Sequence, residues 1–100
     1  MKGKFCYKEH KLGVDVTLAI CDAVLLGKVL KFNDVDFEVC EDFYGKNVTD
    51  SGHILELIER AKMINAIGKE TIELLKKNRL VRKESVLMID GIPHVQIINS

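Results

Sequence analysis

The sequence predicts an α+β protein: a mostly antiparallel sheet with two helices packed on one face and a C-terminal β-hairpin. Three observations support this fold class. Apolar and polar residues alternate over residues 14–21, as in a half-buried strand. Two later segments carry apolar residues at helical spacing. Asp90-Gly91 stands between two apolar runs and indicates a tight hairpin turn.

The first half of the chain is predicted to consist mainly of strands. Phe5 and Tyr7 indicate a short opening strand, which ends in a polar stretch at residues 8–13 before the alternating strand begins. Asn33-Asp34 is a two-residue turn signal between two further strand-like segments, at residues 29–32 and 35–39. These segments predict a second hairpin.

Helices are predicted where a polar cap precedes apolar periodicity. Asp22 is placed to cap a single helical turn, which Gly27 would end. A longer helix follows a cap within residues 49–51, and residues 65–68 break it before a second helix over residues 69–78. The predicted buried stripe of the longer helix comprises Ile54, Leu55, Leu57, Ile58 and Ala61.

The last segments form the C-terminal hairpin. A strand at residues 86–89 leads into the Asp90-Gly91 turn, and residues 94–98 return antiparallel. Pro93 lies early in the returning strand. Because proline cannot donate to a ladder, its position predicts a sheet edge or a bulge there.

Composition predicts one domain, residues 1–100, with 47% apolar and 30% charged residues. Fifteen basic and fifteen acidic residues cancel, so bulk charge favours neither nucleic acid nor membrane. No apolar run approaches a membrane span, and no apolar segment follows the N-terminal lysines as in a signal peptide. Three cysteines without a C-x-x-C pair argue against a disulfide framework. We therefore expect a cytoplasmic protein with reduced thiols and no membrane partner.

No metal or cofactor is expected. The three histidines and three cysteines lack the closely spaced pairs of structural zinc sites. Asp34, Asp36 and Glu38 alternate along a strand and, with Glu41 and Asp42, could hold a divalent cation through carboxylate oxygens. The alternative is that they form the solvated side of a strand whose apolar side chains face the core. As an acidic patch, they could also meet a basic partner.

Residues 63–72 resemble the hairpin of helix-hairpin-helix modules, in which a tight turn opens a second helix. In those modules, backbone N–H groups at the start of the second helix hold a phosphate. The resemblance places such donors near Gly68, and the chain departs from the module at Ala66, where a glycine is usual. The alternative is an ordinary break between two packed helices.

A basic run follows this hairpin, with five basic residues and no acid within residues 76–83. Such a run is typical of a surface that binds the phosphates of RNA or DNA. In the alternative, it is a solvated helix end, where cations offset the helix dipole. The predicted RNA- or phosphate-binding residues are Gly68, Lys69, Lys76, Lys77, Arg79, Arg82 and Lys83.

Four short motifs occur in one order along the chain: Ala19-Ile20-Cys21-Asp22, Leu25-Leu26-Gly27-Lys28, Glu41-Asp42-Phe43-Tyr44-Gly45 and Gly91-Ile92-Pro93-His94-Val95-Gln96. Together they make the chain similar to domain-of-unknown-function family 424, a group of small archaeal proteins. The resemblance covers about residues 5–98. It implies an archaeal cytoplasmic protein of this length without an assigned activity, and it favours a role connected with RNA and translation.

The resemblance also implies a site where polar and aromatic motif residues recur in loops, because loops on a rigid scaffold often carry function. These residues are Asp22, Lys28, Glu41, Asp42, Tyr44, His94 and Gln96. In the alternative, residues 41–45 form a structural corner with both aromatic side chains buried and the acids capping backbone N–H groups.

The leading hypothesis is a non-enzymatic module that binds RNA or a ribonucleoprotein such as the ribosome. A second hypothesis is a protein-interaction adaptor that uses the acidic stretch at residues 34–42 and an edge strand near Pro93. A small enzyme built on Asp42, Tyr44 and His94, with Cys21 or Cys40, is the third, and it requires these side chains to meet in one pocket. A homodimer is left open.

Overall fold

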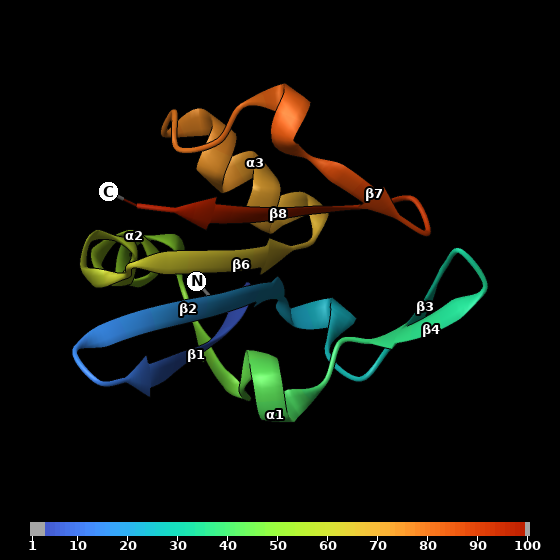
Figure 1. Ribbon diagram of the computed structural model, residues 1–100, viewed down its shortest axis with the longest axis horizontal. Helices are drawn as coiled ribbons and strands as arrows, with labels where there is room; N and C mark the ends of the chain where they lie inside the picture. Colours follow the sequence, from blue (N-terminus) through green and yellow to red (C-terminus); the bar gives the residue numbers. More distant parts are fainter. Residues whose placement is uncertain (1–3, 100) are drawn as a thin grey trace.

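The computed structural model describes residues 4–99 and is built on a six-stranded sheet with the order β5-β1-β2-β6-β8-β7 (Figure 1). β2 and β6 run parallel, and the other neighbouring strands are antiparallel. The expected α+β class with a mostly antiparallel sheet is thus confirmed. The strands are β1 (Phe5–Leu12), β2 (Asp15–Asp22), β5 (Asn47–Thr49), β6 (Met63–Ile67), β7 (Leu87–Ile89) and β8 (Ile92–Ile98).

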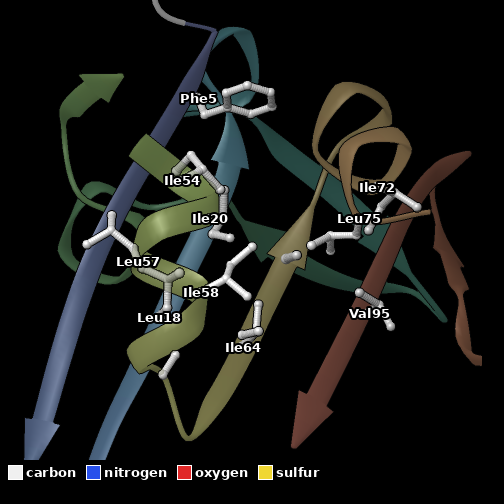
Figure 2. Packing of buried hydrophobic residues seen from close by; sticks show 12 residues of the cluster. Phe5, Leu18, Ile20, Ile54, Leu57, Ile58, Ile64, Ile72, Leu75 and Val95 are labelled. Carbon is white, nitrogen blue, oxygen red and sulfur yellow. The ribbon is translucent and has the colours of Figure 1, made fainter. Parts of the chain in front are cut away.

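Two helices, α2 (Ser51–Arg60) and α3 (Lys69–Lys77), cover one face of this sheet, as predicted. The Asp50 carboxylate caps α2 by accepting a hydrogen bond from the backbone N–H of His53 (3.1 Å). Figure 2 shows side chains of both helices lying over Leu18 of β2, Ile64 of β6 and Val95 of β8. Within residues 4–99, no helix is long and apolar enough to cross a membrane.

The opposite face is only partly covered. The short helix α1 (Glu41–Tyr44), the 3-10 turn η1 (Ala23–Leu25) and a separate hairpin of β3 (Val29–Phe32) and β4 (Val35–Glu38) pack against it. Side chains alternate along a strand, so the neighbours of Ile64 and Val95 project to this second face. There, Met63, Asn65 and His94 are half-buried and Gln96 and Ile98 are exposed. We call these five residues the open sheet face.

The opening strand is longer than the sequence predicted. Residues 8–12, expected in a loop, continue β1 and pair with β2 up to Leu12 and Asp15. This end of the strand extends past the apolar cover, and Leu12 is 85% exposed. Residues 8–12 therefore show no alternation of apolar and polar residues in the sequence, although their backbone pairs with β2 throughout.

The predicted helix–turn–helix at residues 63–72 is wrong. Helix α2 ends at Arg60, Ala61 is extended, and residues 63–67 form the central strand β6. In a short apolar run, helical and strand periods are hard to separate. Pairing with β2 on one side and β8 on the other decides the conformation here.

Both predicted two-residue turns are confirmed. Asn33 and Asp34 (φ 51° and 66°) join β3 to β4, and Asp90 and Gly91 (φ 53° and 77°) join β7 to β8. Positive φ at both central positions gives the turn a twist that matches the strands. The second turn completes the predicted C-terminal hairpin.

Pro93 does not lie at a sheet edge or bulge, contrary to the prediction. It belongs to β8, between β6 and β7, where it faces Met88. The Pro93 carbonyl accepts a hydrogen bond from the Gly68 N–H (2.9 Å). The carbonyl and the nitrogen of one strand residue face the same neighbour, so the Pro93 nitrogen also faces the β6 side, beyond Ile67, the last residue of β6 that pairs with β8. No ladder donor is needed there, which is why proline is tolerated.

Candidate functional site

The side chain of Asp22 closes the N-terminus of α3. Its carboxylate accepts hydrogen bonds from the backbone N–H groups of Glu70 (3.0 Å) and Thr71 (2.7 Å) and from the Thr71 hydroxyl (2.7 Å). The sequence predicted that Asp22 caps the turn directly after it, but η1 receives no side-chain cap. Asp22 is buried, so this motif residue has a structural partner rather than a solvent-facing role.

This cap contradicts the predicted binding of phosphate by backbone N–H groups near Gly68. The Gly68 N–H donates to Pro93, and the donors of Glu70 and Thr71 are held by Asp22. Gly68 has φ 122°, and a Cβ at this position would overlap the Asp22 carboxylate. Gly68 therefore allows the Asp22 side chain to approach the N-terminus of α3 closely. The Asp22 carboxylate occupies the position that a bound anion would take there.

The six cationic residues of the predicted phosphate-binding set remain exposed. They lie on α3, on the segment that follows it, and at the first residue of a second 3-10 turn, η2 (Lys83–Ser85). The ion pairs within residues 4–99 involve other cations, namely Lys4, Lys31, Lys46 and Arg60. The set, which we call the α3–η2 cations, comprises Lys69, Lys76, Lys77, Arg79, Arg82 and Lys83.

A groove of about 340 Å³ lies between α3 and the β7–β8 hairpin. Two of the α3–η2 cations, Lys69 and Lys76, line it together with Glu73. The remaining lining is uncharged and consists of Ile72, Val86, Met88, Gly91 and Pro93. The groove thus combines an apolar floor with an excess of positive charge.

A second groove, of about 330 Å³, lies between α3, β1 and the start of α2. Its lining includes three carboxylates, Asp50, Glu70 and Glu73, against two lysines, Lys4 and Lys77. This excess of negative charge disfavours anions, so the groove beside β7 is the better candidate for phosphates.

A polar cluster joins Tyr44 and His94 through Asn65 of β6. The Tyr44 hydroxyl donates to Asn65 Oδ1 (2.9 Å), and His94 Nε2 lies 3.2 Å from the same oxygen. The structure therefore brings together two residues that the family motifs singled out. Asn65 was missed, since residues 65–68 were interpreted as a helix break. Its polar side chain between Ile64 and Ala66 was the available signal of a strand with two different faces.

Burial keeps this cluster uncharged at neutral pH. Desolvation raises the pKa of Tyr44 above its usual range, and the neighbouring Cys21 and Cys40 raise it further. Desolvation also lowers the pKa of His94, so its imidazole is neutral at pH 7. Because Asn65 Oδ1 accepts hydrogen bonds, His94 Nε2 carries the proton and Nδ1 is left as an acceptor. The cluster is suited to neutral hydrogen bonding.

Aromatic rings border the cluster. The Phe37 ring meets His94 edge-on at a centroid distance of 6.4 Å. Phe43 stacks on His10 at 4.9 Å and meets Tyr44 edge-on. The His10 imidazole also lies 2.7 Å from the Phe43 carbonyl oxygen. Half-buried rings on both sides of the cluster provide surfaces on which planar groups can stack.

The remaining motif residues do not join this cluster directly. Lys28 is exposed before β3, and Glu41 forms an ion pair with Lys46 (3.7 Å). Asp42 is exposed, and its carbonyl oxygen accepts a hydrogen bond from Lys8 Nζ (2.9 Å). Gln96 faces Asn65 across the β6–β8 ladder and donates to the sulfur of Met63 (3.2 Å).

The structural-corner alternative for residues 41–45 is correct in part. Tyr44 is buried and Phe43 half-buried, whereas both acids are exposed and neither caps a backbone N–H. Gly45 has φ 76°, and a Cβ there would overlap the carbonyl oxygen of Tyr7 on β1. The glycine allows α1 to pass close to the sheet, which places Tyr44 above Asn65.

The small-enzyme hypothesis receives little support from the cysteines. Cys6 and Cys21 are buried, and desolvation raises the pKa of both thiols, that of Cys21 to about 12. Their thiols are therefore protonated at neutral pH and are poor nucleophiles. Among residues 4–99, no group of three or more histidine, cysteine, aspartate or glutamate side chains is placed to hold a metal ion.

Comparison with known proteins gives a fold relative and a family. The structure matches the crystal structure of an uncharacterized conserved protein from Methanopyrus kandleri with a TM-score of 0.78. The two share 27% sequence identity, and the match covers 93% of this chain and 89% of the other. No curated protein matches the chain. The family model described as "Protein of unknown function (DUF424)" matches residues 10–99, and the chain belongs to this family.

Proposed function

We propose that this protein binds RNA through the α3–η2 cations. The observation that carries the proposal is that all six side chains are exposed, while the ion pairs within residues 4–99 use other cations. Exposed basic groups without internal partners can neutralise phosphates and release counterions, which is the main source of affinity for nucleic acids. The net charge of zero makes this a local property of one surface.

The groove between α3 and β7 supports the same assignment. Lys69 and Lys76 line it, seven positions apart and thus two helical turns along α3. A phosphate backbone is an extended polyanion and can contact cations spaced in this way. The apolar floor at Ile72 and Met88 can accept sugars or bases that a purely charged surface would not hold.

The test is a titration with total cellular RNA at about 50 mM and about 200 mM salt. Contact with several phosphates predicts a fall in affinity of a few powers of ten over this range. The informative variant is Lys76→Glu/Lys77→Glu/Arg82→Glu. Arg79 is left unchanged because its positive φ (59°) makes a substitution there liable to disturb the backbone.

The matched control reverses three exposed lysines elsewhere, Lys11→Glu/Lys28→Glu/Lys62→Glu, which take part in no ion pair within the described residues. We expect the first variant to lose at least tenfold in affinity and to show a shallower salt dependence, while the control retains most of its binding. Equal losses in both variants would contradict the assignment to this surface. A stoichiometric protein partner that co-purifies after nuclease treatment would favour the adaptor hypothesis instead.

A further inference from the structure

We propose that the open sheet face binds an unpaired base of the RNA, with Asn65 and His94 as the residues that contact the base edge. This inference rests on the proposed function and makes it more specific. It identifies single-stranded RNA as the ligand and assigns base contact to the sheet and phosphate contact to the α3–η2 cations.

The cluster has polar groups that the described residues leave without a hydrogen bond. Asn65 Oδ1 is used by Tyr44 and His94, whereas Asn65 Nδ2 and His94 Nδ1 form no hydrogen bond among residues 4–99. They constitute one donor and one acceptor on paired neighbouring strands, β6 and β8. Every nucleobase carries an acceptor beside a donor on its Watson–Crick edge, and RNA-binding proteins read that edge in single strands.

Asn65 and His94 are both held in place by neighbouring side chains. The Tyr44 hydroxyl donor comes from a ring that is only 2% exposed, so Asn65 is oriented by a rigid partner. His94 is oriented by Asn65 and by the edge of the Phe37 ring. A polar side chain fixed in this way on a central strand loses little further entropy when it binds a ligand.

The two long helices leave the open sheet face uncovered. Helices α2 and α3 lie on the other side of the sheet, above Ile64 and Val95 (Figure 2). On the open sheet face, Gln96 is exposed and Ile98 is 66% exposed. The half-buried ring of Phe37 meets His94 at the border of this surface, and stacking on aromatic rings is how sheets commonly hold unpaired bases.

The open sheet face also lies close to one of the α3–η2 cations, Lys83. Leu87, the first residue of β7, pairs with His94. Lys83 of η2 precedes Leu87 by four residues, which limits their separation to about 14 Å. One short RNA strand can therefore contact Lys83, the one α3–η2 cation that lies in η2, and place a base on the open sheet face.

The experiment compares one labelled 12-nucleotide RNA of mixed sequence, as a single strand and as a duplex with its complement, by fluorescence anisotropy at constant salt. The variant is His94→Phe, which keeps a ring and removes both nitrogens. The matched control is His53→Phe, since His53 is also half-buried and also meets an aromatic ring edge-on, but lies on α2 on the opposite face. Thermal melting verifies that both variants are folded.

We expect the single strand to bind at least tenfold more tightly than the duplex. His94→Phe should lower the affinity for the single strand about tenfold and leave the affinity for the duplex unchanged. His53→Phe should change neither affinity. As a measurement that needs no variant, the side-chain amide NMR signals of Asn65 should shift on titration with the single strand and stay in place with the duplex.

Two other results are informative. Equal binding of single strand and duplex, with His94→Phe unchanged and the Asn65 signals unmoved, would overturn the base site and leave RNA binding by the α3–η2 cations intact. No binding of either RNA at low salt would overturn the proposed function and the base site together.

Discussion

Replacing Asp22 with alanine is expected to lower the free energy of unfolding by about 3 kcal/mol. Loss of a helix N-cap costs roughly 0.5–2 kcal/mol. Thr71 is 0% exposed, so water cannot replace Asp22 as the hydrogen-bond partner of its N–H and hydroxyl groups. Leaving these buried donors unpaired adds roughly 1–3 kcal/mol to the loss of stability. Glu70 is exposed, and its N–H can bind water instead. Asp22→Asn keeps one acceptor oxygen and should cost only about 1 kcal/mol.

A double-mutant cycle isolates the contact between Asp22 and Gly68. Gly68→Ala is expected to cost more than about 2 kcal/mol, because the new Cβ overlaps the Asp22 carboxylate and because φ 122° strains an L-residue. In the Asp22→Ala background, the overlap is removed and only the backbone strain remains. The two substitutions should therefore be non-additive, with a coupling energy of at least about 1 kcal/mol.

The assay is urea unfolding followed by circular dichroism, with a two-state analysis and a comparison of the m-values. Asp50→Ala is the control, since Asp50 caps α2 with a single, exposed hydrogen bond and should cost about 1 kcal/mol. If Asp22→Ala destabilised the protein no more than Asp50→Ala, the buried cap described for α3 would be refuted. If the effects of Asp22→Ala and Gly68→Ala were strictly additive, the close contact between the two residues would be refuted.

Three further predictions concern the face of the sheet that lies away from α2 and α3. With a thiol reagent at pH 8, the half-buried Cys40 should react first and the buried Cys6 and Cys21 much more slowly; equal rates for all three in the folded state would argue against the burial described. Burial lowers the pKa of His94 in the folded state, so the unfolded chain binds more protons near pH 6. The free energy of unfolding should therefore fall as the pH drops below about 6.5, and a His94→Phe variant with an unchanged profile would contradict this. Gly45→Ala should cost at least about 2 kcal/mol in urea unfolding, because of its positive φ and the overlap with a β1 carbonyl; a cost under about 0.5 kcal/mol would disprove the close approach.

Much of the fold was predictable because its signals are local. Asn33-Asp34 and Asp90-Gly91 adopt the positive φ values that their side chains tolerate, and each turn sets the register of its own hairpin. Helix α3 was predicted almost to its ends from the spacing of Ile72 and Leu75. The basic run is likewise a property of consecutive residues. Its exposure follows because helix ends and loops lie at the surface.

Other features depend on residues far apart in the chain. Residues 63–67 satisfy both helical and strand spacing, and only the pairing of β6 with β2 and β8 makes them a strand. The same pairing separates the polar Asn65 from the buried Ile64 and Ala66. The motif residues Tyr44 and His94 could be singled out from the sequence, but Asn65, the residue that joins them, could not.

By itself, then, the sequence determined that α2 and α3 form, where the two hairpin turns lie, the family and the α3–η2 cations. The tertiary structure decided which polar groups meet. Asp22 caps residues 48 and 49 positions further on, and Asn65 binds partners 21 positions before and 29 after it. Such contacts exist only once β2 and β6 lie side by side in parallel. No local pattern encodes them, because the crossover between parallel strands leaves the register to the packing of the whole core.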